Sequence, residues 1–235
     1  MDKLDRISAE TFVQPGDVVL DIGAMHGTTA AAYVARGASA VYSFEPLARS
    51  RDRIPDELKA NPAFHLLPYA LCDRSGRQDL IVPRRNDGAG SLSRAYLEQA
   101  KRDDTDPGEV HSVEVRTLDE LGLPRANFWK VDIEGAELGL LRGAERTLRD
   151  AAPDIVQMEI FLLDEAVYLE TLNRLQQRFP HLWAIGFRSP GGFIRYDITT
   201  ENISNPQFHL DLARAGTPHY YASSRPYEAW FPAGL

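Results

Sequence analysis

The stretch Val18–Gly27, with the sequence VVLDIGAMHG, decides the fold that we expect for this chain. Its apolar first half follows the turn signal Pro15-Gly16-Asp17 and is typical of a buried strand. The next segment, Thr28–Arg36, is rich in alanine and predicts a helix, with Gly37 at its C-cap position. A strand that ends in a glycine turn and leads into a helix is the first unit expected of a parallel α/β sheet.

The rest of the chain continues this alternation of strands and helices. Further strands are predicted at 40–44, 64–71, around Val113 and Val115, at 128–133, at 155–162 and at Tyr220-Tyr221. Helices are predicted from Ser91 to about Arg102, from Glu134 to a stop at Pro153, and from Tyr168 to Phe179. The alternation predicts a mostly parallel sheet with helices on both faces.

Composition and charge narrow the class of protein. The chain has 235 residues, and we expect one domain over 1–235, with an N-terminal extension at 1–14 and a variable loop and helix region at 84–110. The formal net charge of -8 disfavours nucleic acid as a partner, because an acidic surface repels phosphate. No stretch approaches the roughly 18 apolar residues that span a bilayer. With no signal peptide and with Cys72 as the one cysteine, we expect a cytoplasmic protein without a membrane partner.

The glycine turn after the first predicted strand is a candidate ligand site. Gly23 and Gly27 allow a tight turn and let a ligand approach the backbone and the N-terminus of the next helix. Their spacing is G-x-x-x-G rather than the G-x-G-x-x-G of dinucleotide sites, which favours S-adenosylmethionine (SAM), a ligand without a pyrophosphate. We expect these residues to contact the cofactor: Asp21, Gly23, Ala24, Gly27 and Thr28. The alternative is a glycine-closed turn that binds no ligand.

Two further acidic residues follow predicted strands and extend the candidate cofactor site. Glu45 ends the second strand, about 20 residues after Gly23, where a carboxylate accepts hydrogen bonds from both hydroxyls of an adenosine ribose. NAD and SAM both carry this ribose, so Glu45 supports adenosine binding in general. Asp73 follows the third strand and is either an acceptor for the adenine amino group or a turn-forming residue before Ser75-Gly76.

A second acidic cluster follows the strand predicted at 128–133. Ligands of open α/β sheets bind beyond the carboxyl ends of the strands, and Asp132 and Glu134 lie at this edge. They are candidates to deprotonate an acceptor hydroxyl, or to hold a divalent metal together with Glu159, and Asp132 is also a candidate contact of the cofactor. The alternative is capping of the following helix, which we favour for Glu137. His26, inside the glycine turn, is another candidate base, with an exposed loop histidine as its alternative.

Taken together, these segments resemble the FkbM-type SAM-dependent methyltransferase family. The most specific likeness is Lys130–Leu138, KVDIEGAEL, which runs on to Ala144. Other segments with the likeness are Val19–Gly27, Val41–Pro46, Pro68–Asp73 with Gly76, Gly90–Leu92, Thr117–Asp119 and Glu159-Ile160. The resemblance implies a Rossmann-like class I methyltransferase fold of seven strands, the last antiparallel, and O-methylation, often of sugars or natural products.

The expected function is therefore SAM-dependent methylation of a hydroxyl on a sugar or small natural product. The resemblance does not fix the acceptor, and we expect a small-molecule partner and allow for a homo-oligomer. Two other functions stay open from the sequence. One is an NAD-dependent oxidoreductase, which the missing third glycine disfavours. The other is a SAM-binding module without catalytic activity.

Overall fold

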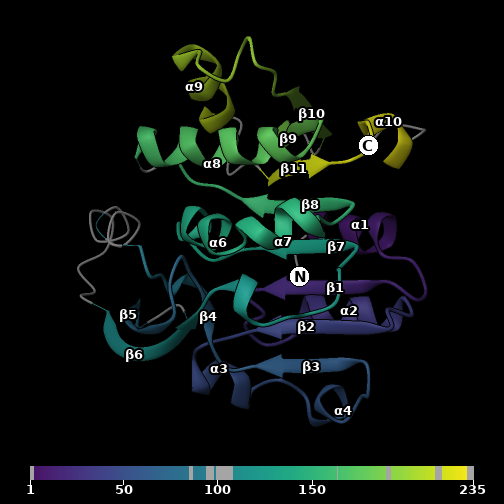
Figure 1. Cartoon of the computed structure of the whole chain (residues 1–235), viewed down its shortest axis with the longest axis vertical. Helices are drawn as coiled ribbons and strands as arrows, with labels where there is room; N and C mark the ends of the chain where they lie inside the picture. The colour runs from purple at the N-terminus through teal and green to yellow at the C-terminus, as the bar shows by residue number, and fades with distance from the viewer. Residues whose placement is uncertain are drawn as a thin grey trace.

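The computed structural model describes residues 3–84, 87–93, 98, 108–162, 164–188, 192–214 and 219–231, and it shows an α/β fold (Figure 1). The main sheet has, in spatial order, β10 (Gly192–Asp197), β9 (His181–Arg188), β11 (His219–Ser223), β8 (Ile155–Glu159), β7 (Phe128–Val131), β1 (Val18–Ile22), β2 (Ala40–Phe44) and β3 (Phe64–Leu67). Neighbours from β8 to β3 pair in parallel, whereas β11 pairs antiparallel with β8 and β9. The expected mostly parallel sheet is confirmed.

The strand count differs from the expectation. The described residues form eight strands in this sheet instead of seven, and the additional one is β10, which pairs antiparallel with β9. No strand was predicted for β10, because its residues are partly exposed along most of its length and show no alternation of buried and exposed positions.

A smaller sheet has the order β4 (Ala70–Leu71), β6 (Glu109–Arg116) and β5 (Gly76–Val82). Figure 1 places it beside the carboxyl ends of the parallel strands. The single strand predicted at 64–71 is wrong, since it divides into β3 and β4 around Pro68. Proline has no N–H to donate to a continuing ladder, so a change of sheet is favourable there.

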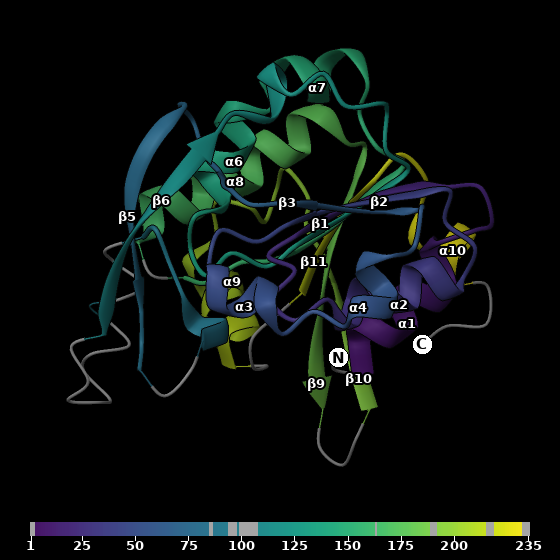
Figure 2. The same cartoon turned by 90° about the horizontal axis from the view of Figure 1, so that it is seen from below.

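Helices cover both faces of the main sheet (Figure 2). One face carries α6 (Glu137–Gly143), α7 (Glu145–Asp150) and α8 (Glu165–Arg178), and the other carries α1 (Lys3–Phe12), α2 (Thr28–Ala35), α4 (Asp56–Lys59) and α10 (Tyr227–Trp230). The remaining helices are α3 (Ala48–Asp52), α9 (Pro206–Arg214) and the 3₁₀ turns η1 (Asp87–Ala89) and η2 (Leu118–Glu120). Each face has its own apolar core. Within the described residues, no helix is long and apolar enough to cross a membrane.

Several predicted helix boundaries need correction. The helix expected from Glu134 begins at Glu137, because Glu134 and Gly135 have left-handed φ values of 55° and 92°. It divides at Ala144 into α6 and α7. The predicted extension 1–14 contains α1, whose Leu4 and Phe12 are buried. The helix expected from Ser91 lies mostly outside the described residues, and Ser91 itself pairs with Ile81 in a β-bridge.

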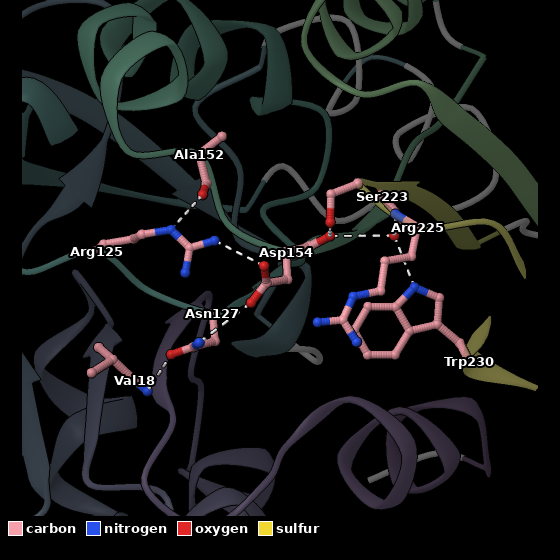
Figure 3. A network of polar contacts seen from close by, with 9 residues as sticks. Val18, Arg125, Asn127, Ala152, Asp154, Ser223, Arg225 and Trp230 are labelled. Carbon is pink, nitrogen blue, oxygen red and sulfur yellow. Dashed lines mark hydrogen bonds and ion pairs between the residues drawn. The ribbon is translucent and has the colours of Figure 1, made fainter.

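The amino ends of the central strands are joined by a polar network (Figure 3). Asn127 accepts from the Val18 N–H through its Oδ1 at 3.0 Å and donates through its Nδ2 to Asp154 at 3.3 Å. Arg125 also donates to Asp154, at 2.9 Å. The Asp154 carbonyl accepts from Ser223, whose hydroxyl in turn accepts from the Trp230 indole at 2.8 Å. The network connects β1, β7, β8, β11 and α10.

We expect Asn127→Ala to lower the free energy of unfolding by about 1–3 kcal/mol, because it leaves the Val18 N–H without its partner. Urea unfolding followed by circular dichroism measures the change. Asn173→Ala is the matched control, since Asn173 is exposed on α8 and alanine is a better helix former. An equal loss in the two variants would contradict a special role for Asn127.

Candidate active site

The carboxyl ends of β2, β1 and β7 are joined through their backbones. The N–H groups of Gly23 and Ala24 both donate to the Phe44 carbonyl, at 3.1 and 3.0 Å. The Asp132 N–H donates to the Ile22 carbonyl at 3.0 Å. The turn after β1 is therefore held between the ends of its two neighbouring strands.

The two glycines of this turn are favoured by their backbone conformation, and Gly23 is also required by the packing of the chain. A Cβ on Gly23 would lie 1.9 Å from the Asp132 carbonyl oxygen, and one on Gly27 would lie 3.0 Å from Leu58 Cδ2. Both residues have positive φ, 90° and 76°. Besides the tight turning and ligand approach expected of both glycines, Gly23 brings the turn after β1 onto the turn after β7.

A pocket opens at this edge of the sheet and contains about 710 Å³ of space not filled by protein atoms, open solvent included. Its lining combines residues from both sheets and from the two turns: Ile22, Gly23, Met25, Phe44, Glu45, Pro46, Leu47, Ala70, Leu71, Leu80, Gly88, Gly90, Leu92, Asp132, Ile133 and Ala136. Most of these side chains are apolar, and Glu45 and Asp132 are the two that carry a carboxyl group.

Glu45 is fixed at the end of β2 by two backbone groups. Its Oε2 accepts from the Met25 N–H at 2.9 Å and its Oε1 from the Leu47 N–H at 2.8 Å. Burial raises the pKa of Glu45 to about 7, although both N–H groups and Arg51 favour the ionised form. Each carboxylate oxygen has a further lone pair, so the side chain can still accept hydrogen bonds from a ligand.

Asp132 is fixed by a buried lysine. The Lys130 ammonium lies 3.0 Å from Asp132 Oδ2, and the two side chains are 6% and 33% exposed. Burial lowers the pKa of Lys130, but the charges of Asp132, Asp21 and Asp5 outweigh it and raise that pKa above the usual value. Lys130 therefore remains an ammonium, and Asp132 presents a partly exposed carboxylate to the pocket.

Asp21 lies beneath the pocket instead of lining it. Its carboxyl group is fully buried and accepts from Thr29 Oγ1 at 3.1 Å and from Ser43 Oγ at 3.3 Å. Burial raises the pKa of Asp21, while the charge of Lys130 acts in the opposite direction. Asp21 therefore supports the pocket indirectly, through its hydrogen bonds with Thr29 and Ser43.

Residues 87–93 form one wall of the pocket and are tied to the turn after β7. Gly88, Gly90 and Leu92 line the pocket. Between them, the Ser91 hydroxyl donates to the Glu134 carbonyl oxygen. The Ser91 backbone also exchanges two hydrogen bonds with Ile81 of β5, at 3.0 and 3.1 Å. Ser91 thus connects the smaller sheet to the second acidic cluster.

The turn after β7 is strained. Glu134 has a φ of 55°, and Met25 in the opposite turn has a φ of 48°; these are the non-glycine residues with positive φ among those that the structure describes. Such conformations are unfavourable for ordinary residues and concentrate at functional sites. Glu137 accepts from the Gly135 N–H at 2.9 Å and is 3% exposed, in agreement with the capping role favoured from the sequence. Burial raises the pKa of Glu137 to about 8.

The structure brings together some of the predicted site residues and separates others. Gly23, Glu45 and Asp132 line the pocket, whereas the lining does not include the other candidates, which are Asp21, Ala24, His26, Gly27, Thr28, Asp73, Glu134 and Glu159. Asp73 is exposed, with Arg74 3.6 Å away, as expected of a turn residue. His26 lies at the side of the turn, with its Nε2 3.5 Å from Arg53.

The proposed metal ligands are not assembled into a cluster. Across the described ranges, no group of three or more His, Cys, Asp or Glu side chains is placed to hold a metal ion. Asp132 is engaged by Lys130, and Glu159 ends β8, paired in register with His219 of β11. Asp132 is therefore placed to contact Lys130 and a ligand in the pocket.

Sequence reasoning missed Lys130 and the wall residues of the smaller sheet. Lys130 carried a signal, because a lysine inside the apolar run Phe128–Val131 is seldom buried without an acidic partner. For the wall formed by Leu80, Gly88, Gly90 and Leu92, the sequence carried only the family likeness of Gly90–Leu92, which did not place these residues at the pocket, since their position depends on pairing between distant segments.

Comparison with known proteins agrees with this geometry. The model of the methyltransferase FkbM domain family matches residues 21–184, more than half of the chain. The 2-O-methyltransferase NoeI of Sinorhizobium fredii (strain NBRC 101917 / NGR234) is 28% identical in an alignment of 158 residues, and the match covers 62% of this chain and 65% of that protein. The chain thus aligns with just under two thirds of that relative.

A solved structure supports the fold. The methyltransferase FkbM from Methylobacillus flagellatus KT superposes with a TM-score of 0.51 at 19% identity, over 78% of this chain and 44% of that chain. The family match favours methyl transfer over the oxidoreductase alternative. Because the family model matches residues 21–184, which include the glycine turn and the acidic segment after β7, the chain belongs to the methyltransferase FkbM domain family.

Proposed function

We propose that this protein transfers the methyl group of SAM to a hydroxyl of a sugar or small natural product. The observation that carries the proposal is the joint position of Glu45 and Asp132 in one largely apolar pocket at the carboxyl edge of the sheet. The relative named as a 2-O-methyltransferase supports oxygen as the accepting atom. The family match supports SAM as the methyl donor.

The residues of the pocket fit the parts of SAM. Glu45 is a buried carboxyl group, 8% exposed, and a ribose offers two hydroxyl donors to such a group. Leu47, Leu71 and Leu80 form apolar walls suited to a flat adenine ring. Asp132 supplies a negative charge at the other side of the pocket, where it suits the cationic part of the ligand.

The chemistry requires alignment and one proton acceptor. When bound, SAM supplies an electrophilic methyl carbon on a sulfonium, which leaves as the neutral thioether S-adenosylhomocysteine. The protein orients the acceptor hydroxyl toward this carbon, and alignment of this kind is worth about 7–11 kcal/mol. Of the three candidate bases, Asp132 is the one that lines the pocket, and we assign to it the proton released from the hydroxyl.

The direct test is methyl transfer from radiolabelled SAM to a panel of mono- and oligosaccharides and hydroxylated natural products. Label in the acceptor, followed by mass spectrometry of the product, supports the proposal and identifies the methylated oxygen. Calorimetry with SAM and with NAD is run in parallel. Binding of NAD but not SAM would overturn the proposal, and SAM binding without transfer to any acceptor would favour a non-catalytic module.

Glu45→Ala should weaken SAM binding by about ten-fold or more, because it removes the acceptor for two ribose hydroxyls. Isothermal titration calorimetry measures the dissociation constant. Glu57→Ala, at an exposed position of α4, is the control. Thermal unfolding of each variant checks that the loss of the Met25 and Leu47 contacts has not unfolded the site. Unchanged affinity in a folded Glu45→Ala protein would remove the ribose assignment.

SAM binding should also depend on pH through Glu45, whose pKa is raised to about 7. Hydroxyl donors favour the ionised carboxylate, so binding lowers this pKa and releases a proton when the pH is below it. Affinity is therefore expected to rise between about pH 6 and about pH 8. Calorimetry at several pH values measures the trend, and Glu45→Gln should flatten it. An affinity that falls with pH would contradict the assignment.

Asp132→Asn should lower kcat by about 100-fold or more, because an amide cannot take up the hydroxyl proton. The dissociation constant for SAM should change less than kcat does. The assay uses the acceptor that the panel identifies, with steady-state kinetics and calorimetry on the same preparations. Asp150→Asn, at an exposed position of α7, is the matched control. If kcat is retained in Asp132→Asn, this carboxylate is not the base.

A further inference from the structure

A buried polar row crosses the main sheet beneath helix α1. In-register pairing places Ser43 beside Asp21, Asp21 beside Lys130, and Lys130 beside Gln157, on β2, β1, β7 and β8. Residues paired in register project to the same face of a sheet. The exposures of the four residues are 0%, 0%, 5% and 1%, so water does not solvate this row.

Helix α1 adds a carboxyl group to the row. Asp5 is 9% exposed, and its Oδ1 accepts from Gln157 Nε2 at 3.1 Å. Its charge also acts on Lys130 and on Asp21. The family model begins at residue 21, so α1 is a part of this chain outside the matched region that nevertheless reaches the polar row.

The cluster contains more acid than base. Three carboxyl groups, those of Asp5, Asp21 and Asp132, surround the single ammonium of Lys130. Asp5, Asp21 and Lys130 are buried, whereas Asp132 is 33% exposed and lines the pocket. Burial raises the pKa of Asp21 and so favours its neutral form, which leaves the negative charges of Asp5 and Asp132 against the positive charge of Lys130. Water screens the buried charges poorly, and the excess negative charge therefore acts on whatever lies next to Asp132.

We propose that this cluster, with Asp5 of α1 as a member, makes the pocket prefer a sulfonium ligand to the corresponding neutral thioether. The inference rests on the proposed function, because it takes SAM and S-adenosylhomocysteine as the two ligands. They differ by one methyl group and by the positive charge on sulfur. A pocket with excess negative charge retains the substrate and releases the product, which favours turnover. Asp5 and Lys130 are specificity-determining residues that act through Asp132.

The test compares the dissociation constants of SAM and S-adenosylhomocysteine by calorimetry on the full chain. Asp5→Asn removes one negative charge and keeps an Oδ1 acceptor for Gln157. The preference for SAM, expressed as the ratio of the two constants, should fall about three-fold or more. Glu10→Gln, at an exposed position of the same helix, should leave the ratio unchanged. If Asp5 had only a structural role, Asp5→Asn would weaken the binding of both ligands equally. A constant ratio of the two dissociation constants in Asp5→Asn would therefore overturn the inference.

A second variant shifts the charge in the opposite direction. Lys130→Gln removes the ammonium and keeps a donor for Asp132, so the ratio should rise in favour of SAM. This arm decides the question if Asp5→Asn does not fold, and a ratio that falls or stays constant in Lys130→Gln then overturns the inference.

The failure of the proposed function and the failure of the charge-cluster inference give different results. A wild-type protein that binds neither ligand refutes the proposed function, whereas binding of both with ratios insensitive to these charges refutes the cluster alone.

Discussion

The close approach of Gly23 to the Asp132 backbone is the constraint on which the site depends. With a Cβ at Gly23 only 1.9 Å from the Asp132 carbonyl oxygen, any other residue would push the two turns apart. Such a shift would also separate Glu45, which is anchored on the Met25 N–H, from Asp132. The strained φ values of Met25 and Glu134 occur in these two turns, so the surrounding contacts hold them in unfavourable conformations.

The two edges of the sheet have different roles. At the amino edge, Asn127 and Asp154 form hydrogen bonds with backbone and side-chain groups of several strands, so their polar atoms are used within the protein. At the carboxyl edge, backbone bonds fix the turns, but the acidic side chains of Glu45 and Asp132 remain at the pocket surface. Rigid support on one side, and anchored carboxyl groups with further acceptor capacity on the other, are what a binding site on a parallel sheet requires.

Local patterns in the sequence predicted the main sheet and the central residues of the site. Features that depend on contacts between distant segments were not predicted. The turn with Gly23, the strand-end Glu45 and the acidic Asp132 follow from the order of strand, turn and helix, which a short stretch encodes. The smaller sheet depends on pairing of β5 with β6 across a long connection, which no local pattern reveals. Asp73 and His26 were candidates because they lie in turns that follow strands, with a turn-forming aspartate and an exposed loop histidine as the alternatives. In the structure Asp73 lies 3.6 Å from Arg74, and His26 lies 3.5 Å from Arg53.

The buried row of Asp21, Lys130 and Gln157 is difficult to explain by stability alone. Burial of charges costs desolvation energy that pairing only partly offsets, and apolar replacements of such groups are often neutral or stabilising. An apolar row would also continue the core that surrounds it. It would, however, leave Asp132 without the ammonium that fixes it. The row instead places Lys130 against Asp132, the carboxylate that lines the pocket, so the buried charges that act on Lys130 are coupled to the binding site through this one contact.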